Sequence, residues 1–313
     1  MRISAVIPCF NGEQYLSEAL ASVRVQTRAA DEVIVVDDGS TDRSADIATS
    51  MGATVVRQEN RGEGAARNAG IAAARGDVIA WLDADDTWRP RHLAVVAGLL
   101  ESHPEASGAF GGVQRFGDDG RAIFGYVPTD GPGEVLFEAF RDWLHTTIAA
   151  VVRRAALIEV GGFDEAQRYS VDFDLWLRLS RSHTFVATRE ITSNWRWHEG
   201  QQSSSWDRQL AAAYHYRRKF IDQLWAEGDG DLASRLEEEI AAVWLRDMRS
   251  AIGQKDPRAA FVLRRAARLV ETLTPWQRRS WTLLSFAPGP VTDVAMKARR
   301  YVRGSAAAAG NRG

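Results

Sequence analysis

The chain has 313 residues, of which 45% are hydrophobic and 26% are charged. This composition predicts a folded globular protein with a substantial core, organised as one large domain or as one domain with a helical appendage. The formal net charge of -2 excludes a chain that binds polyanions along its whole length.

The charge is unevenly distributed along the sequence. From Pro257 onward there are eleven Lys and Arg residues against Glu271 and Asp293, a net charge of +9. Residues 1–256 therefore carry a net charge of -11. The sequence combines an acidic body with a basic C-terminal region.

Cys9 is the only cysteine, which excludes an intramolecular disulfide and a multi-cysteine metal site and favours a reducing compartment. The apolar run before Pro8 is too short for a secretory signal, and no stretch of about 18 uninterrupted apolar residues occurs. We expect a cytoplasmic protein that is either free or bound peripherally to the cytosolic face of a membrane.

Strand and helix patterns alternate through the first 100 residues. Short apolar runs rich in β-branched residues predict buried strands at residues 3–7, 32–36, 54–57 and 78–82. Amphipathic patterns predict helices at residues 13–26, 44–50, 64–74 and 91–102. This alternation predicts an α/β fold with a mostly parallel sheet, which binds ligands at the carboxyl ends of its strands.

The remainder of the chain is more mixed and then becomes helical. Extended segments are predicted at residues 107–116 and 121–127, and helices at 134–144, 174–181, 208–225, 231–251 and 257–272. The low-complexity segment 304–313 is predicted to be disordered.

Polar residues follow the predicted strand that ends at Val36. Asp37 and Asp38 can accept hydrogen bonds from a ring N–H or a ribose hydroxyl, and Gly39 allows the chain to turn. The alternative interpretation is a plain turn in which Ser40 caps the next helix.

A second acidic cluster follows Leu82. Asp83 and Asp85 are alternate residues of an extended segment, so both can point into one cleft. Two carboxylates held so close repel each other unless a cation lies between them. Mg²⁺ commonly binds one or two carboxylates together with phosphate oxygens, which predicts a metal-bound diphosphate at this strand end.

These motifs together resemble the family 2 glycosyltransferases. The resemblance rests on the order and spacing of VIPCFN (6–11), VVDDGSTD (35–42), NRG (60–62), ARNAG (66–70), LDADD (82–86), GGFD (161–164) and DFDLWLRL (172–179). It covers about residues 1–200 and implies a GT-A fold, a Rossmann-like, mostly parallel sheet flanked by helices.

The resemblance also implies a domain organisation. The glycosyltransferase domain would span residues 1–205, with a nucleotide-sugar-binding half at 1–105 and an acceptor half at 106–205. A helical region would follow at 206–303, and the disordered tail at 304–313.

Family members transfer a sugar with inversion from a nucleotide-diphosphate donor to an acceptor hydroxyl. By similarity, Pro8 and Phe10 line the nucleobase pocket beside Asn11, Asp38 bonds the base, and Asp83 contacts the ribose or the metal shell. Asp85 holds Mg²⁺ or Mn²⁺ on the diphosphate. Arg67 contacts the nucleotide side of the cleft; the alternative interpretation of Arg67 is a surface ion pair.

The resemblance places the catalytic base at Asp172, which opens the helix of the DLWLR segment. Inversion requires a carboxylate within hydrogen-bond reach of the attacking oxygen. Val171 stands where the family often has Glu, which removes a neighbouring acid. Asp174 is the competing candidate, and a purely helix-stabilising role of Asp172 is the alternative interpretation.

His198 lies after an extended stretch, in the segment WRWHEG (195–200). Many family members have an Arg-X-His segment here, whose imidazole can approach the diphosphate or the metal. A structural or solvent-facing role is the alternative for a lone histidine.

The basic C-terminal region intersperses aromatic residues with cations. Trp276, Trp281 and Phe286 lie among arginines, a mixture that suits an anionic lipid surface. The alternative is an ordinary helical bundle whose tryptophans are packed inside. Nucleic acid is not an expected partner, because the body is acidic and no reading module is identifiable.

The sequence therefore predicts a metal-dependent inverting glycosyltransferase with a glycan or lipid-linked acceptor, acting in polysaccharide or glycolipid biosynthesis of the cell envelope. A catalytically silent nucleotide-sugar-binding or scaffolding protein is the main alternative. A metal-dependent nucleotidyltransferase is a third interpretation, which the GGFD and DLWLR segments disfavour.

Overall fold

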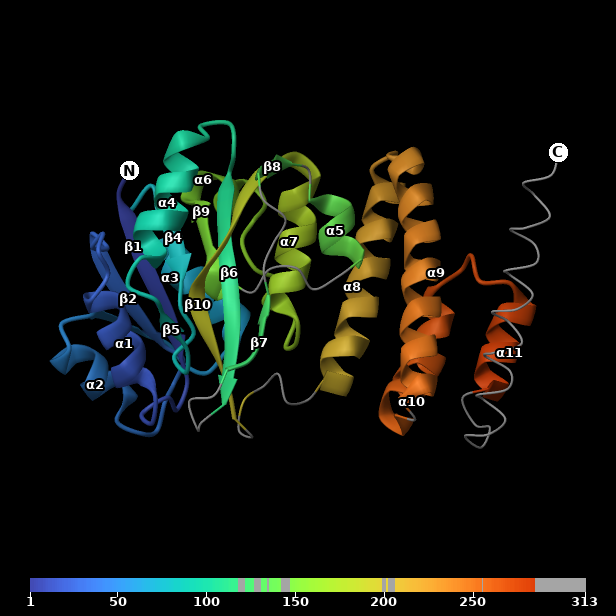
Figure 1. Cartoon of the computed structure of the whole chain (residues 1–313), viewed down its shortest axis with the longest axis horizontal. Coiled ribbons are helices and arrows are strands. Elements are labelled where there is room, and N and C mark those ends of the chain that lie inside the picture. The colour runs from blue at the N-terminus through green and yellow to red at the C-terminus, as the bar shows by residue number, and fades with distance from the viewer. Residues whose placement is uncertain are drawn as a thin grey trace. The chain divides into compact units, whose positions relative to one another are not determined.

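The computed structural model describes residues 1–117, 122–126, 131–133, 135–141, 147–198, 201, 206–254 and 256–284. The chain divides into two compact units, Met1–Ser204 and Ser205–Gly313 (Figure 1). The segment 304–313, predicted to be disordered, lies outside the described residues, as does the basic stretch 285–303.

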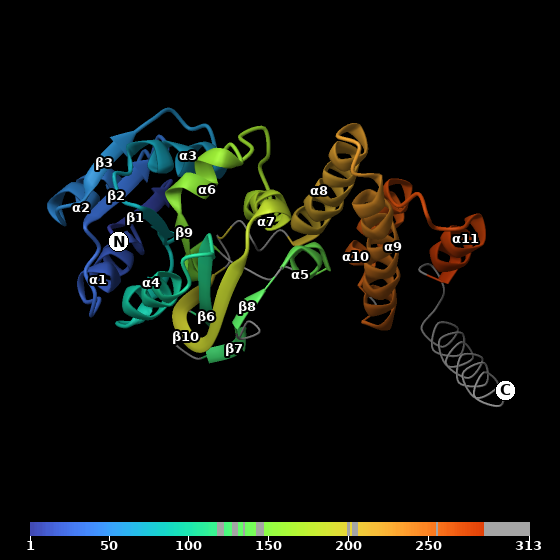
Figure 2. The ribbon, with the colours of Figure 1, turned by 90° about the horizontal axis from the view of Figure 1, so that it is seen from above.

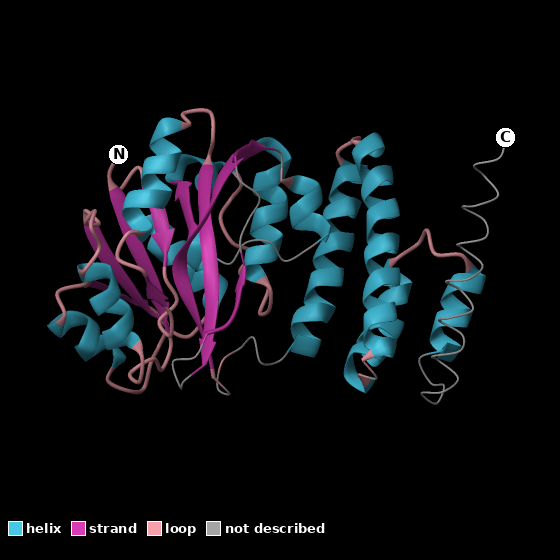
Figure 3. Cartoon of the chain, in the orientation of Figure 1, coloured by secondary structure: helices cyan, strands magenta, loops and turns pink. Residues whose placement is uncertain are grey.

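The first unit is built on a mixed sheet, in which the described residues form ten strands (Figure 3). The strands are β1 (Ile3–Cys9), β2 (Glu32–Asp37), β3 (Thr54–Arg57), β4 (Val78–Trp81), β5 (Thr87–Trp88), β6 (Gly108–Gly117), β7 (Ala122–Tyr126), β8 (Gly131–Gly133), β9 (Ala150–Arg153) and β10 (Phe185–Trp197). Their order is β3-β2-β1-β4-β9-β6-β10-β5, with β7 paired to β6 and β8 to β10.

The predicted parallel pairing holds for the first four strands. β1 pairs in parallel with β2 and β4, and β2 with β3. Beyond β4 the sheet is mixed: β9 runs antiparallel to both of its neighbours, β4 and β6, whereas β6 and β10 are parallel. The sheet is therefore less parallel than the sequence predicts, because β9 enters it between β4 and β6 from the opposite direction.

Helices cover both faces of this sheet. They are α1 (Leu16–Arg24), α2 (Ser44–Ser50), α3 (Glu63–Ala73), α4 (His92–Ser102), α5 (Leu136–Arg141), α6 (Arg154–Glu159) and α7 (Val171–Ser182), with the 3-10 helix η1 (Thr147–Ala149) before β9. Figure 2 shows α3, α6 and α7 on one face and α1 and α4 on the other. Of the predicted helix 134–144, residues 134 and 142–144 lie outside the described part of the chain.

The face covered by α1 and α4 contains the main hydrophobic core. Alternate residues of β1, among them Ile3 and Ile7, are fully buried against apolar side chains of both helices. Alternation along β1 and the 3.6-residue period of α4 thus point their apolar side chains at each other.

On the opposite face, α3 lies unusually close to β1. A Cβ atom added at Gly70 would lie 2.3 Å from Cγ1 of Val6, well inside contact distance. The glycine therefore sets the distance between helix and strand. It also fixes where the rest of α3, which carries Arg67, lies relative to the sheet.

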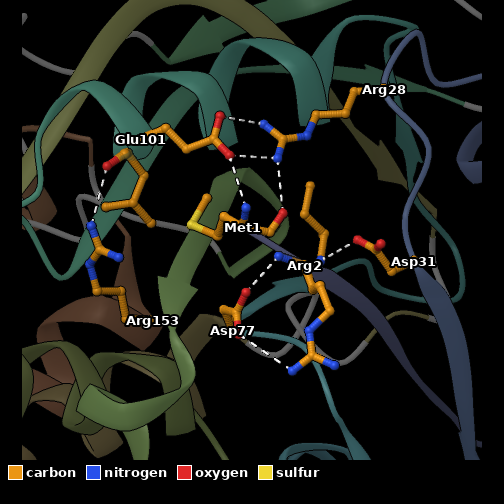
Figure 4. A network of polar contacts seen from close by, with 9 residues as sticks. Met1, Arg2, Arg28, Asp31, Asp77, Glu101 and Arg153 are labelled. Carbon is orange, nitrogen blue, oxygen red and sulfur yellow. Dashed lines mark hydrogen bonds and ion pairs between the residues drawn. The ribbon is translucent and has the colours of Figure 1, made fainter.

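Polar contacts fix the amino end of β1, at the edge of the sheet opposite the strand-end motifs (Figure 4). The backbone N–H of Arg2 donates to Asp77 at 2.7 Å, and that of Ile3 donates to Asp31 at the same distance. Arg28 forms a two-pronged ion pair with Glu101 of α4. The bonds from Arg2 and Ile3 satisfy backbone donors at the start of the strand.

The second unit is helical, as predicted. It contains α8 (Trp206–Ala226), α9 (Gly230–Gly253), α10 (Pro257–Ala266), the 3-10 helix η3 (Ala267–Leu269) and α11 (Pro275–Leu284). Trp244 of α9 is fully buried, and its indole N–H donates to the carbonyl of Leu263 in α10 at 2.7 Å. In the described part of the chain, no helix combines the length and the apolar composition that a membrane crossing requires.

One boundary in this unit differs from the sequence prediction. The expected helix at 257–272 ends at Ala266 and continues as a 3-10 turn, and a further helix, α11, lies within the region predicted to be helical. α11 begins with a reciprocal cap: Gln277 N–H donates to the Thr274 hydroxyl, and Thr274 N–H donates to the Gln277 side chain. This Thr-X-X-Gln pattern, with Pro275 at the first position, is the local signal that starts the helix.

Candidate active site

The loops that follow β1 and β2 are bonded to each other. Asn11 has a φ of 51°, a left-handed conformation that is uncommon outside glycine. Its backbone N–H donates to the Ser40 hydroxyl, and its side-chain oxygen accepts from the Thr41 N–H, both at 2.9 Å. Phe10 is 52% exposed and Pro8 is half-buried at the same strand end. An exposed aromatic ring on a fixed loop is available for stacking on a planar ligand.

Asp38 lies at the end of β2 and is 4% exposed. Its carboxylate accepts hydrogen bonds from the backbone N–H groups of Arg61 and Gly62, at 2.9 and 2.8 Å, and from the Gln58 side chain at 2.7 Å. Asp38 therefore fixes the turn that leads into α3. Its expected contact with a nucleobase stays a prediction.

The acidic loop after β4 brings Asp85 to His198. Asp85 Oδ2 and His198 Nε2 are 3.0 Å apart, although the residues are 113 positions apart in the sequence. Burial raises the pKa of Asp85, and the charge of Asp83 adds to this effect, while His198 opposes it. Asp83 and Asp85 are two partly buried carboxylates of one short loop, an environment that an added cation would stabilise.

Arg196, which the sequence analysis did not single out, holds this loop in place. Its backbone N–H donates to the buried carboxylate of Asp86 at 2.7 Å, and its Nε donates to the carbonyl of Asp85 at 2.9 Å. The guanidinium also pairs with Glu18 and lies over the Tyr15 ring, 4.6 Å from its centroid. Alternation along β10 points Arg196 and His198 the same way, which was the available sequence signal.

Arg67 is buried, so its interpretation as a surface ion pair is wrong. Its guanidinium is 2% exposed and pairs with Glu63 at 2.6 Å and Asp83 at 2.8 Å. It also donates to the Thr147 hydroxyl at 3.0 Å and lies 5.3 Å from the Phe163 ring centroid. Burial alone would lower the pKa of Arg67. The negative charges of Glu63 and Asp83 outweigh this effect, so the pKa of Arg67 lies above its ordinary value. Arg67 is a permanent positive charge buried between α3, the loop after β4 and η1.

Asp172 lies in the first turn of α7, after Ser170 in a left-handed conformation with φ of 52°. Its Oδ1 accepts from the Phe173 N–H at 2.9 Å. Burial raises the pKa of Asp172, and the positive charge of Arg67 partly opposes this effect. The competing candidate Asp174 is bound to Arg178 at 2.7 Å one turn along the same helix.

The GGFD loop is hydrogen-bonded to both α3 and α7, the helices that carry Arg67 and Asp172. Asn68 of α3 accepts from the Phe163 N–H at 2.8 Å and donates to the Phe163 carbonyl at 2.9 Å. From the other side, Arg178 donates to the carbonyls of Val160 and Gly162 at 2.6 and 2.7 Å. Residues of the ARNAG and DFDLWLRL motifs therefore hold the GGFD loop in place through hydrogen bonds.

Among the described residues, no group of three or more His, Cys, Asp or Glu side chains is arranged to hold a metal ion. Asp85 and His198 provide one oxygen and one nitrogen ligand, which leaves most coordination positions of a divalent cation to other donors. This donor set fits an ion that is completed by phosphate oxygens, which is the usual manner of binding for Mg²⁺ at substrate phosphates.

The strand-end motifs can now be compared with known proteins. The model of a family described as Glycosyl transferase family 2 matches residues 4–161, just over half of the chain. The chain belongs to this family. The predicted resemblance is confirmed, and the match includes every motif from β1 to the start of the GGFD loop.

Curated relatives of the chain have glycosyltransferase names. An uncharacterised glycosyltransferase of Nostoc sp. is 43% identical over 108 residues, which are 33% of this chain and 34% of that protein. A Rickettsia prowazekii relative with the same description is 28% identical over 72% of this chain and 73% of its own. The putative glycosyltransferase EpsH of Bacillus subtilis is 44% identical over 28% of this chain and 27% of its own. The match to the Nostoc protein thus spans about a third of that relative's length.

Solved structures show the same fold. TarS 1–349 of S. aureus, in complex with UDP-GlcNAc, superposes with a TM-score of 0.66 and 20% identity over 86% of this chain and 82% of its own. The mannosyltransferase PcManGT of Pyrobaculum calidifontis, in complex with GDP-Man and Mn²⁺, superposes with a TM-score of 0.56 and 20% identity. The superposition covers 91% of this chain and 84% of PcManGT. These similarities confirm the predicted GT-A fold.

Proposed function

We propose that the protein is an inverting glycosyltransferase that moves a sugar from a nucleoside-diphosphate donor to an acceptor hydroxyl. The observation that carries this proposal is the grouping of Asp172, Arg67, Asp83 and Asp85, whose charges act on one another across the cleft. It unites a carboxylate of raised basicity with a site suited to a metal-bound diphosphate.

Asp172 is the proposed general base. Its carboxylate takes the proton of the acceptor hydroxyl while that oxygen bonds to the anomeric carbon and the bond from this carbon to the diphosphate oxygen breaks. Because burial raises its pKa, Asp172 is a stronger base than an exposed aspartate. Asp174 is less suited to this role, since its carboxylate is bound to Arg178.

The donor is proposed to lie across the ends of β1, β2 and β4. Pro8 and Phe10 would flank the nucleobase beside Asn11, Asp38 would bond to the base, and Asp83 to the ribose. The half-exposed Phe10 ring supports the first of these contacts. Arg67 reaches this region through its ion pair with Asp83.

Asp85 and His198 are the proposed ligands of Mg²⁺ or Mn²⁺. A cation bound there would neutralise the charge that develops on the departing diphosphate. The contact between the two side chains and the raised pKa of Asp85 support this assignment. PcManGT, which shares the fold, was solved with Mn²⁺ and a nucleotide sugar.

We propose an acceptor that is a glycan or a lipid-linked saccharide, with a role in polysaccharide biosynthesis for the cell envelope. The match to EpsH, a putative glycosyltransferase, and the nucleotide sugar bound to TarS support glycosyl transfer in general. The proposed location is the cytoplasm, including the cytosolic face of a membrane.

The C-terminal helices are proposed to bind an anionic membrane surface. Exposed residues of α10 and η3 at helical spacing are Arg258, Phe261, Arg265 and Arg268. The corresponding residues of α11 are Trp276, Arg279 and Leu283. Both faces combine arginines with large apolar side chains and have no acidic residue among these positions, which suits anionic headgroups above acyl chains. Trp281 points the other way and is buried beside Arg249.

The proposal is tested by assaying glycosyl transfer with Asp172→Asn. A thermal-shift screen of nucleotide sugars with Mn²⁺ identifies the donor, and transfer is then measured with a panel of acceptors. We expect Asp172→Asn to retain donor binding and to lose about 100-fold or more in kcat, the usual share of a general base.

Asp174→Asn serves as the matched variant on the same helix. It should lower the melting temperature through loss of the Arg178 pair but retain the pH dependence of kcat. Near wild-type transfer by Asp172→Asn would contradict the base assignment. Donor binding without turnover by the wild type would instead show a nucleotide-sugar-binding protein.

A further inference from the structure

Glu63 is a chemical group in the cleft to which the proposed reaction assigns no role. It is the first residue of α3, and its side chain is 31% exposed. Its carboxylate lies 2.6 Å from Nη1 of Arg67, one helical turn further along. The opposite nitrogen of the same guanidinium, Nη2, bonds to Asp83 and Thr147.

These contacts fix the guanidinium at both of its ends. Glu63 binds from α3 itself, Asp83 from the loop after β4, and Thr147 from η1. The Phe163 ring packs beside the group at 5.3 Å. Nη2 is held by two hydrogen bonds and Nη1 by the ion pair alone, so the Glu63 carboxylate is the contact that holds the Nη1 end of the guanidinium.

We propose that Glu63 is a positioning residue, which holds Arg67 against Asp83 and sets the net charge that Asp172 experiences. This inference rests on the proposed function of Asp172. Without Glu63, the guanidinium would lose its contact at Nη1, and its full positive charge would act on Asp83 and Asp172. The carboxylate of Glu63 therefore keeps Asp172 more basic than Arg67 alone would allow.

The charges that face Glu63 come from three elements. Arg67 lies on α3, Asp83 and Asp85 on the loop after β4, and Asp172 on α7. Burial raises the pKa of Glu63 to about 7; Arg67 opposes this effect and the three aspartates add to it. Glu63 thus gains or loses its proton close to neutral pH, in the range where transfer would be measured.

The activity test compares Glu63→Gln and Glu63→Asp with the wild type. Glu63→Gln keeps the size of the side chain and removes its charge. We expect about a 10-fold loss in kcat, the lower end of the range for groups that orient functional side chains. The difference from the wild type should grow as the pH rises through about 7, because below that pH the protonated Glu63 of the wild type also leaves the charge of Arg67 uncompensated.

Glu63→Asp keeps the charge and should restore most of kcat and the wild-type pH dependence of kcat. The neighbouring exposed residue provides a matched control: Glu59→Gln removes one carboxylate four positions earlier and should change neither quantity. A pH profile of Glu63→Gln that superposes on that of the wild type would overturn the positioning role.

A second measurement does not depend on turnover. Because the folded-state pKa of Glu63 lies above the ordinary 4.5, its protonation stabilises the folded form at low pH, and this contribution disappears as the pH rises through about 7. The melting temperature of the ligand-free wild type should fall between about pH 5 and 7, and Glu63→Gln should show a smaller fall.

These two measurements separate the inference from the proposed function. If the wild type transfers no sugar, the proposed function fails, and the melting profiles still decide whether Glu63 is bound to Arg67 in the cleft. An equal fall in Glu63→Gln, Glu59→Gln and the wild type would then overturn the inference. A smaller fall in Glu63→Gln alone would support it.

Discussion

The Asp85 carboxylate shows how burial and function are related in this cleft. A carboxylate that is mostly removed from water resists ionisation unless a cation is supplied. The structure provides one side chain, His198, at 3.0 Å. The contact with His198 and the raised pKa of Asp85 both support the proposed metal site.

Replacement of Asp85 by Asn should abolish Mn²⁺-dependent donor binding. Calorimetric titration of the donor with and without Mn²⁺ measures this directly, with Asp77→Asn, an exposed aspartate at the opposite edge of the sheet, as control. In the wild type, affinity for Mn²⁺ should fall as the pH is lowered through the raised pKa, because protons compete for the same carboxylate. Unchanged Mn²⁺-dependent affinity in Asp85→Asn would refute the metal assignment.

At the scale of single residues, the sequence predicted most of the acidic side chains of the site but few of the residues that bond to them. Asp83, Asp85 and Asp172 lie in recognisable motifs, and the structure places them near one another. Arg196 and Thr147 were missed because their contacts join segments about 80 or more positions apart. The Glu63–Arg67 pair had a local signal, since acidic and basic residues four apart face each other on a helix.

At the scale of elements, the packing of α3 on β1 determines where the cleft residues lie. α3 carries Arg67 and Asn68 on consecutive positions, one bonded to the loop after β4 and the other to the GGFD loop. Any displacement of this helix moves both contacts together. The close approach at Gly70 is therefore a structural requirement of the site as well as of the core.

Gly70→Ala should destabilise the protein by about 1–3 kcal/mol, because the new methyl group overlaps Val6. Gly98 of α4 offers the matched control, since nothing lies within 4 Å of the position that its Cβ would occupy. Gly98→Ala should stabilise the protein by about 0.5–1 kcal/mol through helix propensity. Urea unfolding of both variants measures the difference, and equal effects would contradict the assigned contact.

The elements themselves were predicted where local pattern determines them. The βα alternation of the first 100 residues gave the right strands and helices to within a few positions. β10 was predicted only as an extended stretch before His198, and the short strands β5 and β9 were not predicted, because these strands owe their conformation to partners distant in sequence. Local propensity carries little information about such pairings.

At the scale of the whole molecule, the two units differ in charge. The first contains the acidic cleft, whereas the basic excess of the sequence begins with α10. The exposed faces of α10 and α11 concentrate part of this excess beside Phe261, Trp276 and Leu283, which are 53%, 67% and 71% exposed. Large apolar side chains of this exposure commonly mark an interaction surface.

The full chain should co-sediment with vesicles that contain phosphatidylglycerol and weakly with vesicles of phosphatidylcholine alone. Replacing Arg265 and Arg279 together by Glu should reduce binding by roughly 10-fold or more, since each basic residue near such a surface contributes about 1 kcal/mol. Trp276→Ala should also weaken binding. Trp225→Ala removes an exposed tryptophan bonded to Glu237 and should have no effect. Equal binding by all variants would exclude these faces as the contact.

The position of β10 in the sheet has a consequence for how the first unit folds. β1 and β2 join residues 28 positions apart, such as Ser4 and Glu32, whereas β5 and β10 join Trp88 and Ser193, 105 positions apart. Pairings of such high contact order close slowly, because the entropy of the intervening loop must be overcome first. We expect β1, β2 and β3 to pair early in folding, while His198, which follows β10, reaches Asp85 late. A nascent chain would thus form the proposed donor-binding strand ends before the proposed metal site is complete.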